Sequence, residues 1–168
     1  VCISVADGEN YVEDFTLAAG MSLVAPAATV VGTITLESDT ACYLDKHYPA
    51  TNSDDTVIKN GGTGYAHYIC NILDTRGTGG ALTGCTGIRN ATSGSVIFAR
   101  IGVLFVCASG IGLQDNGTDF GHIHFQAADL YLAGNDAVGI RGQSASTNFI
   151  GYIDHILEIG TPTNTRGI

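Results

Sequence analysis

Apolar and polar positions alternate in short runs through the first forty residues of the chain. Residues 15–17, 21–24 and 29–36 place apolar and polar side chains on opposite faces with the period of two that a strand requires, and each run is too short for a helix. Residues 18–20 and 25–28 are small or include proline, so we expect them to turn the chain without a crossover helix. The pattern predicts a solenoid in which short strands stack on those of the next coil.

A weak internal repeat extends this pattern along the chain. Residues 64–69, 121–125 and 151–156 each begin with glycine and mix aromatic or histidine residues with isoleucine. Each segment precedes a cluster of glycine, isoleucine and arginine, and these clusters lie at 87–89, 139–141 and 166–168. The repeat predicts roughly seven or eight coils of about 20 to 25 residues each.

The first forty residues contain a recognisable set of positions, namely Asp7-Gly8, Tyr11-Val12-Glu13, Gly20, Leu23 and Gly32-Thr33-Ile34-Thr35-Leu36. In these positions the sequence resembles the opening coils of right-handed parallel β-helix proteins, the pectate-lyase-like class that includes bacteriophage tailspikes. The resemblance is strongest over this stretch. The resemblance implies an all-β fold, a right-handed parallel β-helix that forms a single domain over residues 1–168. We expect both ends to continue into a longer polypeptide, because neither carries a visible cap.

Residues 39–60 interrupt the solenoid pattern with a polar stretch that contains proline. We expect this stretch to leave the solenoid as a loop and to rejoin it at a strand over 56–58. Loops on a rigid scaffold often carry recognition, and aromatic faces with charged tips suit carbohydrate. The candidate glycan-binding residues are therefore Tyr43, Lys46, His47 and Tyr48. An ordinary solvated loop is the alternative interpretation of this stretch.

Composition and charge exclude two classes of partner. The chain is 45% hydrophobic and only 14% charged, with 23 glycines, which suits a solenoid whose corners carry small polar residues. Its net charge of −9 and seven scattered basic residues argue against binding nucleic acid through phosphate contacts. The longest apolar run, 101–108, has the length of a strand, so we expect a buried strand and no membrane insertion.

Five cysteines, an odd number, stand at 2, 42, 70, 85 and 107 without a C-x-x-C pair. This spacing supports neither a metal knuckle nor a compact disulfide framework. Cys70 and Cys107 lie in apolar runs, where a free cysteine packs as a small hydrophobic residue. We expect packed thiols, with one disulfide between stacked coils as the alternative.

The sharpest local motif is His122-Ile123-His124. Two histidines separated by one residue on a strand project from the same face, so His122 and His124 are candidate metal ligands, with exposed or hydrogen-bonded side chains as the alternative. In this interpretation Ile123, Phe125 and Ile153 point into the core. We expect no cofactor.

Candidate catalytic groups are scattered along the sequence. Hydrolysis of a polysaccharide needs two carboxylates some 5 to 10 Å apart on one surface. Stacking of coils could gather such a pair from Asp115, Asp119, Asp129, Asp136 and Glu158. Lyase chemistry of the pectate-lyase type implies a basic residue beside an acidic calcium site, for which the candidates are Arg89, Arg100 and Arg141. Each of these residues has a structural role as its alternative.

These observations predict a structural segment of a virion fibre or tailspike, located on a virion surface or outside the cell. The resemblance implies that it works as a homotrimer and presents loops that attach to a host-surface glycan. The first alternative is a polysaccharide lyase or glycoside hydrolase on the same scaffold, since a fold does not determine the chemistry of its site. A bacterial surface adhesin is the second alternative.

Overall fold

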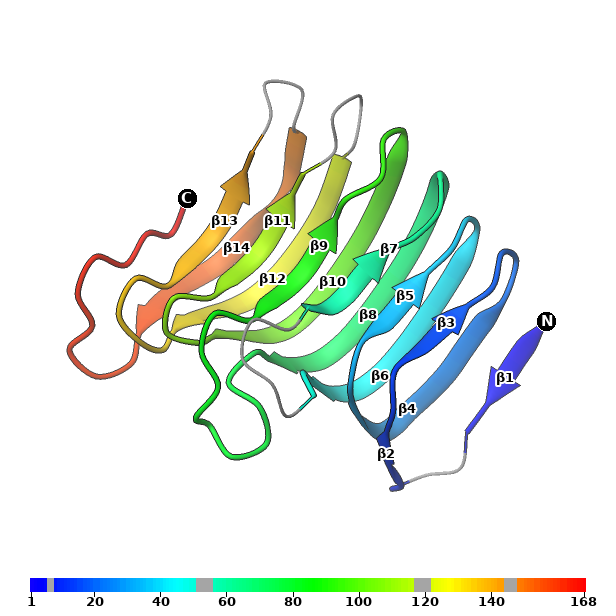
Figure 1. Cartoon of the computed structure of the whole chain (residues 1–168), viewed down its shortest axis with the longest axis horizontal. Coiled ribbons are helices and arrows are strands. Elements are labelled where there is room, and N and C mark those ends of the chain that lie inside the picture. Colours follow the sequence, from blue (N-terminus) through cyan, green and yellow to red (C-terminus); the bar gives the residue numbers. More distant parts are fainter. Residues whose placement is uncertain (6–7, 51–55, 117–121, 144–147) are drawn as a thin grey trace.

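The structure is a computed structural model that describes residues 1–5, 8–50, 56–116, 122–143 and 148–168. All regular secondary structure in this part of the chain is β-strand. Figure 1 shows two stacked layers of strands, with long curved strands behind short ones, and the chain passes from one layer to the other as it advances from its N-terminal to its C-terminal end. No described segment forms a helix long and apolar enough to cross a membrane.

The two layers are parallel sheets, called here the long sheet and the short sheet. The long sheet has the strand order β1-β4-β6-β8-β10-β12-β14, with β2 also paired to β4, and the short sheet has the order β13-β11-β9-β7-β5-β3. The strands of the long sheet are β1 (Cys2–Ser4), β2 (Asn10–Val12), β4 (Ser22–Val31), β6 (Thr40–Tyr48), β8 (Gly64–Asp74), β10 (Ser95–Val106), β12 (His122–Leu132) and β14 (Asn148–Glu158). Those of the short sheet are β3 (Phe15–Leu17), β5 (Ile34–Leu36), β7 (Thr56–Asn60), β9 (Thr86–Asn90), β11 (Ile111–Asp115) and β13 (Val138–Gly142).

Strands that follow one another in sequence from β3 onward alternate between the two sheets. One coil therefore consists of a long strand and the short strand after it, and each strand pairs in parallel with its counterpart in the next coil. This arrangement confirms the predicted all-β fold of stacked parallel strands and is consistent with a solenoid.

The core lies between the two sheets and is built from stacked inward side chains. Leu44, Ile97 and Leu130 are fully buried there, and each such side chain contributes about 1.5–3 kcal/mol relative to its exposure to water. Ile123 and Phe125 are buried as predicted, and Ile153, in the last strand, is partly buried against the same core.

The long strands β6, β8, β10 and β12 each change their alternation once. Two consecutive residues face outward in each of them, namely Asp45-Lys46, Asn71-Ile72, Gly102-Val103 and Ala128-Asp129. Before these pairs the inward positions are odd in β10 and β12, and after them they are even. We call these positions the break of the long strand.

The repeated glycine clusters occupy equivalent places in successive coils. Gly87, Gly112 and Gly139 stack, and a Cβ atom on Gly112 would lie 2.6 Å from the carbonyl oxygen of Gly139. Gly167 continues the stack, because its carbonyl oxygen lies under Gly139. The segment repeat is out of register in its last copy, since Gly151 pairs with Phe125, the last residue of the preceding copy. Stacking at the glycine clusters needs glycine because the coils approach backbone to backbone.

Two predicted boundaries are wrong. Residues 40–48 are not a loop but strand β6. Its inward residues Cys42 and Leu44 alternate with outward residues that are mostly polar, so the stretch has the composition of a loop. Residues 25–28 do not end a strand but lie within β4, where the register with β6 shifts between Ala25 and Thr29. The strand predicted over 56–58 is confirmed by β7, and residues 51–55 lie outside the described part of the chain.

None of the five cysteines forms a disulfide. Cys42, Cys70, Cys85 and Cys107 are buried, whereas Cys2 is exposed. Burial raises the pKa of the Cys70 thiol to about 12, so this side chain packs as a neutral group. The prediction of packed thiols is confirmed for the buried four.

Candidate functional site

The outward face of the long sheet carries two adjoining hollows. One has a volume of about 460 Å³ and the other about 400 Å³. Both are lined by Ile69, Arg100 and Gln126, so they form one continuous depression across β8, β10 and β12. We call this depression the long-sheet groove.

The middle of the groove is a row of side chains taken one from each coil. Register places Ile69 beside Arg100 and Arg100 beside Gln126. The same row continues to Tyr43 on β6 at one end and to Tyr152 on β14 at the other. An aromatic ring therefore stands at each end of the row.

A row of rings flanks this middle row, two residues toward the start of each strand. The ring of Phe98 lies between those of His67 and His124, with centroids 5.0 Å and 4.8 Å away, and the ring of Tyr65 stacks on it at 6.1 Å. Such spacing is typical of favourable aromatic pairs. The parallel register aligns these rings, because residues of the same face in neighbouring coils lie about 4.8 Å apart. We call His67, Phe98 and His124 the ring row.

A row of small or polar residues lies on the other side of the middle row, at the break of the long strands. Gly102 and Ala128 lie in its centre, between Asn71 at one end and Asp154 at the other. A Cβ atom on Gly102 would lie 2.6 Å from the carbonyl oxygen of Asn71, so this position stays without a side chain. The Asn71 amide donates to Asp45 Oδ1 at 2.9 Å, which orients it. The hollow beside Arg100 exists because its floor carries almost no side-chain volume.

Charge in the groove is sparse. Among the lining residues that the structure describes, Arg100 is the only lysine or arginine and Asp154 the only carboxylate. Arg100 is exposed and makes no ion pair or hydrogen bond with the residues that the structure describes. Its guanidinium is thus available to a ligand.

Arg76, just beyond the end of β8, shows the contrasting arrangement. Its Nε and Nη2 atoms donate to the two carboxylate oxygens of Asp74 at 2.9 and 2.7 Å, and its guanidinium lies 4.0 Å from the centre of the Phe105 ring. The bond to Asp74 raises the pKa of Arg76. The Phe105 ring in turn stacks on Tyr131 at 4.9 Å. The charged groups of this cluster pair with each other and its rings stack on each other, which indicates a structural role.

The four residues predicted to bind a glycan do not act together. Tyr43 lines the groove, whereas Lys46 and Tyr48 face outward nearer the end of β6. His47 points inward and is fully buried, so the prediction is wrong for this residue. The break of β6 shifts the alternation by one residue, and that shift turns the imidazole into the core.

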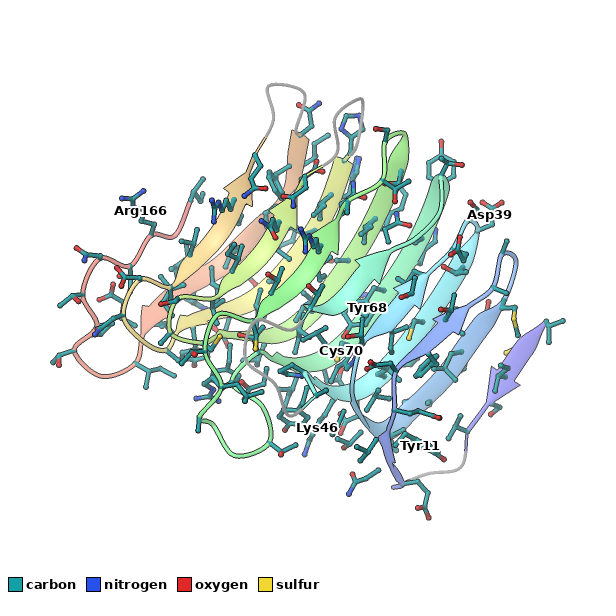
Figure 2. All side chains as sticks on the ribbon, in the orientation of Figure 1. Tyr11, Asp39, Lys46, Tyr68, Cys70 and Arg166 are labelled. Atoms are coloured by element: carbon teal, nitrogen blue, oxygen red, sulfur yellow. The ribbon has the colours of Figure 1, made fainter. Side chains whose placement is uncertain are left out.

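His47 completes a buried hydrogen-bond network. Its Nε2 lies 3.0 Å from the carbonyl oxygen of Gly32, which can only accept, so Nε2 carries the proton and Nδ1 accepts from the Tyr68 hydroxyl at 3.0 Å. Tyr68 reaches this position from β8, within the core (Figure 2). Burial lowers the pKa of His47 to about 3, so the ring is neutral.

His122 and His124 share the outward face of β12 as predicted. Their ring centroids lie 6.4 Å apart, edge to face, and His124 also packs on Phe98. No group of three or more metal-ligating side chains gathers among the residues that the structure describes. The geometry therefore places His124 in the ring row.

The candidate carboxylates lie on different surfaces. Asp115 is buried at the end of β11, in the short sheet, whereas Asp129 faces outward from the long sheet and accepts from His155 Nδ1 at 3.0 Å. Asp136 occupies an exposed turn, and Glu158 bonds with Thr165. Asp119 lies outside the described residues. Arg89 and Arg141 belong to the short sheet, so of the three candidate bases only Arg100 reaches the groove.

Sequence reasoning missed most of the groove. The repeated segments at 64–69 and 121–125 carry His67 and His124. The strand between them, β10, carries Phe98 but begins with Ser95 where the first segment begins with glycine. The repeat is therefore hidden in that coil. Gly102 and Ala128 carry no chemical signal of their own. Only the register between coils brings these residues to one surface.

Comparison of the chain with protein-family models, with curated proteins and with solved structures finds no match.

Proposed function

We propose that this protein is a glycan-binding segment of a right-handed parallel β-helix, and that the long-sheet groove is its binding surface. The observation that carries the proposal is that the ring row lies beside a groove lined by the polar side chains of Asn71, Arg100 and Gln126. Rings and polar groups converge there over several coils, as an extended ligand requires.

A sugar chain matches both components of this surface. Its apolar ring faces can stack on Tyr152 and pack against the outward edges of Phe98 and His124, while its hydroxyl groups bond with polar groups on the opposite side. Asn71 and Gln126 supply amide groups there, which can donate and accept. The groove runs across the coils, so a linear polysaccharide would contact one coil after another.

The charge pattern favours binding over cleavage. Hydrolysis of a glycosidic bond uses two carboxylates about 5 to 10 Å apart. Of the groove residues within the described part of the chain, Asp154 alone is a carboxylate. We therefore propose a binding role, not a hydrolase.

The biological setting is proposed from the resemblance of the opening coils to tailspikes. In that setting the chain is part of a virion fibre or spike, works as a homotrimer and attaches to a host-surface glycan. Sedimentation equilibrium tests the assembly, with a mass three times that of the 17.4 kDa chain as the expected result. A stable monomer would contradict the trimeric fibre but would leave the groove available for binding.

Replacing Phe98 by alanine is expected to weaken glycan binding about tenfold, because it removes the central ring of the ring row. The measurement is the dissociation constant by biolayer interferometry against a panel of neutral and acidic polysaccharides. Phe105→Ala is the matched control, since Phe105 lies on the same strand but packs under Arg76 outside the groove. Equal losses in both variants, or binding of no polymer by the wild-type chain, would refute the proposal.

A further inference from the structure

The long-sheet groove contains one unpaired cation, the guanidinium of Arg100. Arg76, which follows β8, is held by both carboxylate oxygens of Asp74, whereas Arg100 has no partner among the described residues. A cation at the centre of a binding surface, with its donors free, is typical of anion recognition.

The position of Arg100 directs its charge at a ligand in the groove. It lies between Ile69 and Gln126 in the middle row, and Phe98 and Gly102 flank it on the same face of β10. Phe98 offers a ring edge on one side of it, and the bare backbone of Gly102 leaves a hollow on the other. A sugar packed against the ring row can thus bring a substituent to the guanidinium.

The acidic side chain of the groove does not pair with this cation. Asp154 lies two coils and two residues from Arg100, and no ion pair joins the two side chains in the part of the chain that the structure describes. Asp154 can accept from sugar hydroxyls elsewhere on the ligand.

We infer that the groove binds an anionic glycan and that Arg100 holds its negatively charged substituent, a carboxylate or a sulfate ester. This inference rests on the proposed glycan-binding function. Because the chain has a net charge of −9, long-range attraction does not bring a polyanion to it, and recognition of the anion depends on this local contact.

The test compares polymers that differ only in charge. Hyaluronan is measured against its carboxyl-reduced form, and dextran sulfate against dextran, by biolayer interferometry with the full chain. We expect the wild-type chain to bind the charged member of at least one pair tenfold or more tightly, and Arg100→Gln to lose that preference. The pair that shows the preference identifies the substituent.

Two control variants separate charge from geometry. Arg141→Gln removes the same charge from the short sheet, outside the groove, and is expected to keep the preference. Arg100→Lys keeps the charge but loses the paired donors, and is expected to bind the charged polymer more weakly than the wild-type chain.

The remaining outcomes distinguish the two proposals. Equal binding of charged and neutral polymers, with loss of both in Phe98→Ala, would overturn the inference about Arg100 and leave glycan binding intact. A preference for the charged polymer that persists in Arg100→Gln would also overturn the inference. Binding of no polymer in either pair or in the wider panel would overturn both.

Discussion

Replacing Gly112 by alanine is expected to lower the free energy of unfolding by about 3 kcal/mol. The added Cβ atom would lie 2.6 Å from the carbonyl oxygen of Gly139 and 3.1 Å from side-chain carbons of Leu104 and Val106. The oxygen belongs to the backbone of the next coil, whose distance is fixed by the parallel ladder between β11 and β13. The clash therefore forces coils apart at several hydrogen bonds.

Gly79→Ala is the matched control for this change. Gly79 is exposed, and a Cβ atom added to it would meet no heavy atom within 4 Å outside its immediate neighbours. We expect its free energy of unfolding, from urea denaturation followed by far-ultraviolet circular dichroism, to stay within about 0.5 kcal/mol of the wild-type value. A free energy of unfolding for Gly112→Ala as high as that of Gly79→Ala would show that the coils can separate at little cost.

The sequence pattern predicted the class of fold because the inward residues repeat with the period of a strand. It failed where the period changes within a strand. In β6 the outward pair Asp45-Lys46 shifts the alternation, so the inward His47 follows two polar residues and the stretch has the composition of a loop. No residue type marks such a break in the sequence, because Gly102-Val103 and Ala128-Asp129 occupy the same place in other coils.

The candidate site was harder to predict because it belongs to several coils at once. Tyr43 was identified by its ring and Arg100 by its charge, but the sequence does not show that they share a surface, because they lie on β6 and β10, two coils apart. The spacing between coils varies with the length of the corners. Register between strands, which brings Arg100 beside Gln126, cannot be derived from composition.

Acidification is expected to destabilise the protein through His47, by about 2–3 kcal/mol between pH 7 and pH 4.5. The unfolded chain protonates this histidine near pH 6.5, whereas burial lowers the pKa of His47 to about 3 in the folded chain. Between these values only the unfolded chain takes up the proton, so stability is complete above about pH 6.5 and declines as the pH falls toward 3. Burial raises the pKa of its neighbour Tyr68, which stays neutral throughout.

His47→Leu separates this contribution from that of the carboxylates. At pH 7 the variant is expected to be less stable by about 1–3 kcal/mol, because the Tyr68 hydroxyl and the Gly32 carbonyl lose their partner. Its stability should then decline less steeply from about pH 6.5 to about pH 4.5 than that of the wild-type chain, as measured by urea unfolding at each pH. Parallel pH profiles for the two proteins would mean that His47 is protonated in the folded state or reached by water. In that case the loss of stability in acid would not come from the buried network of His47.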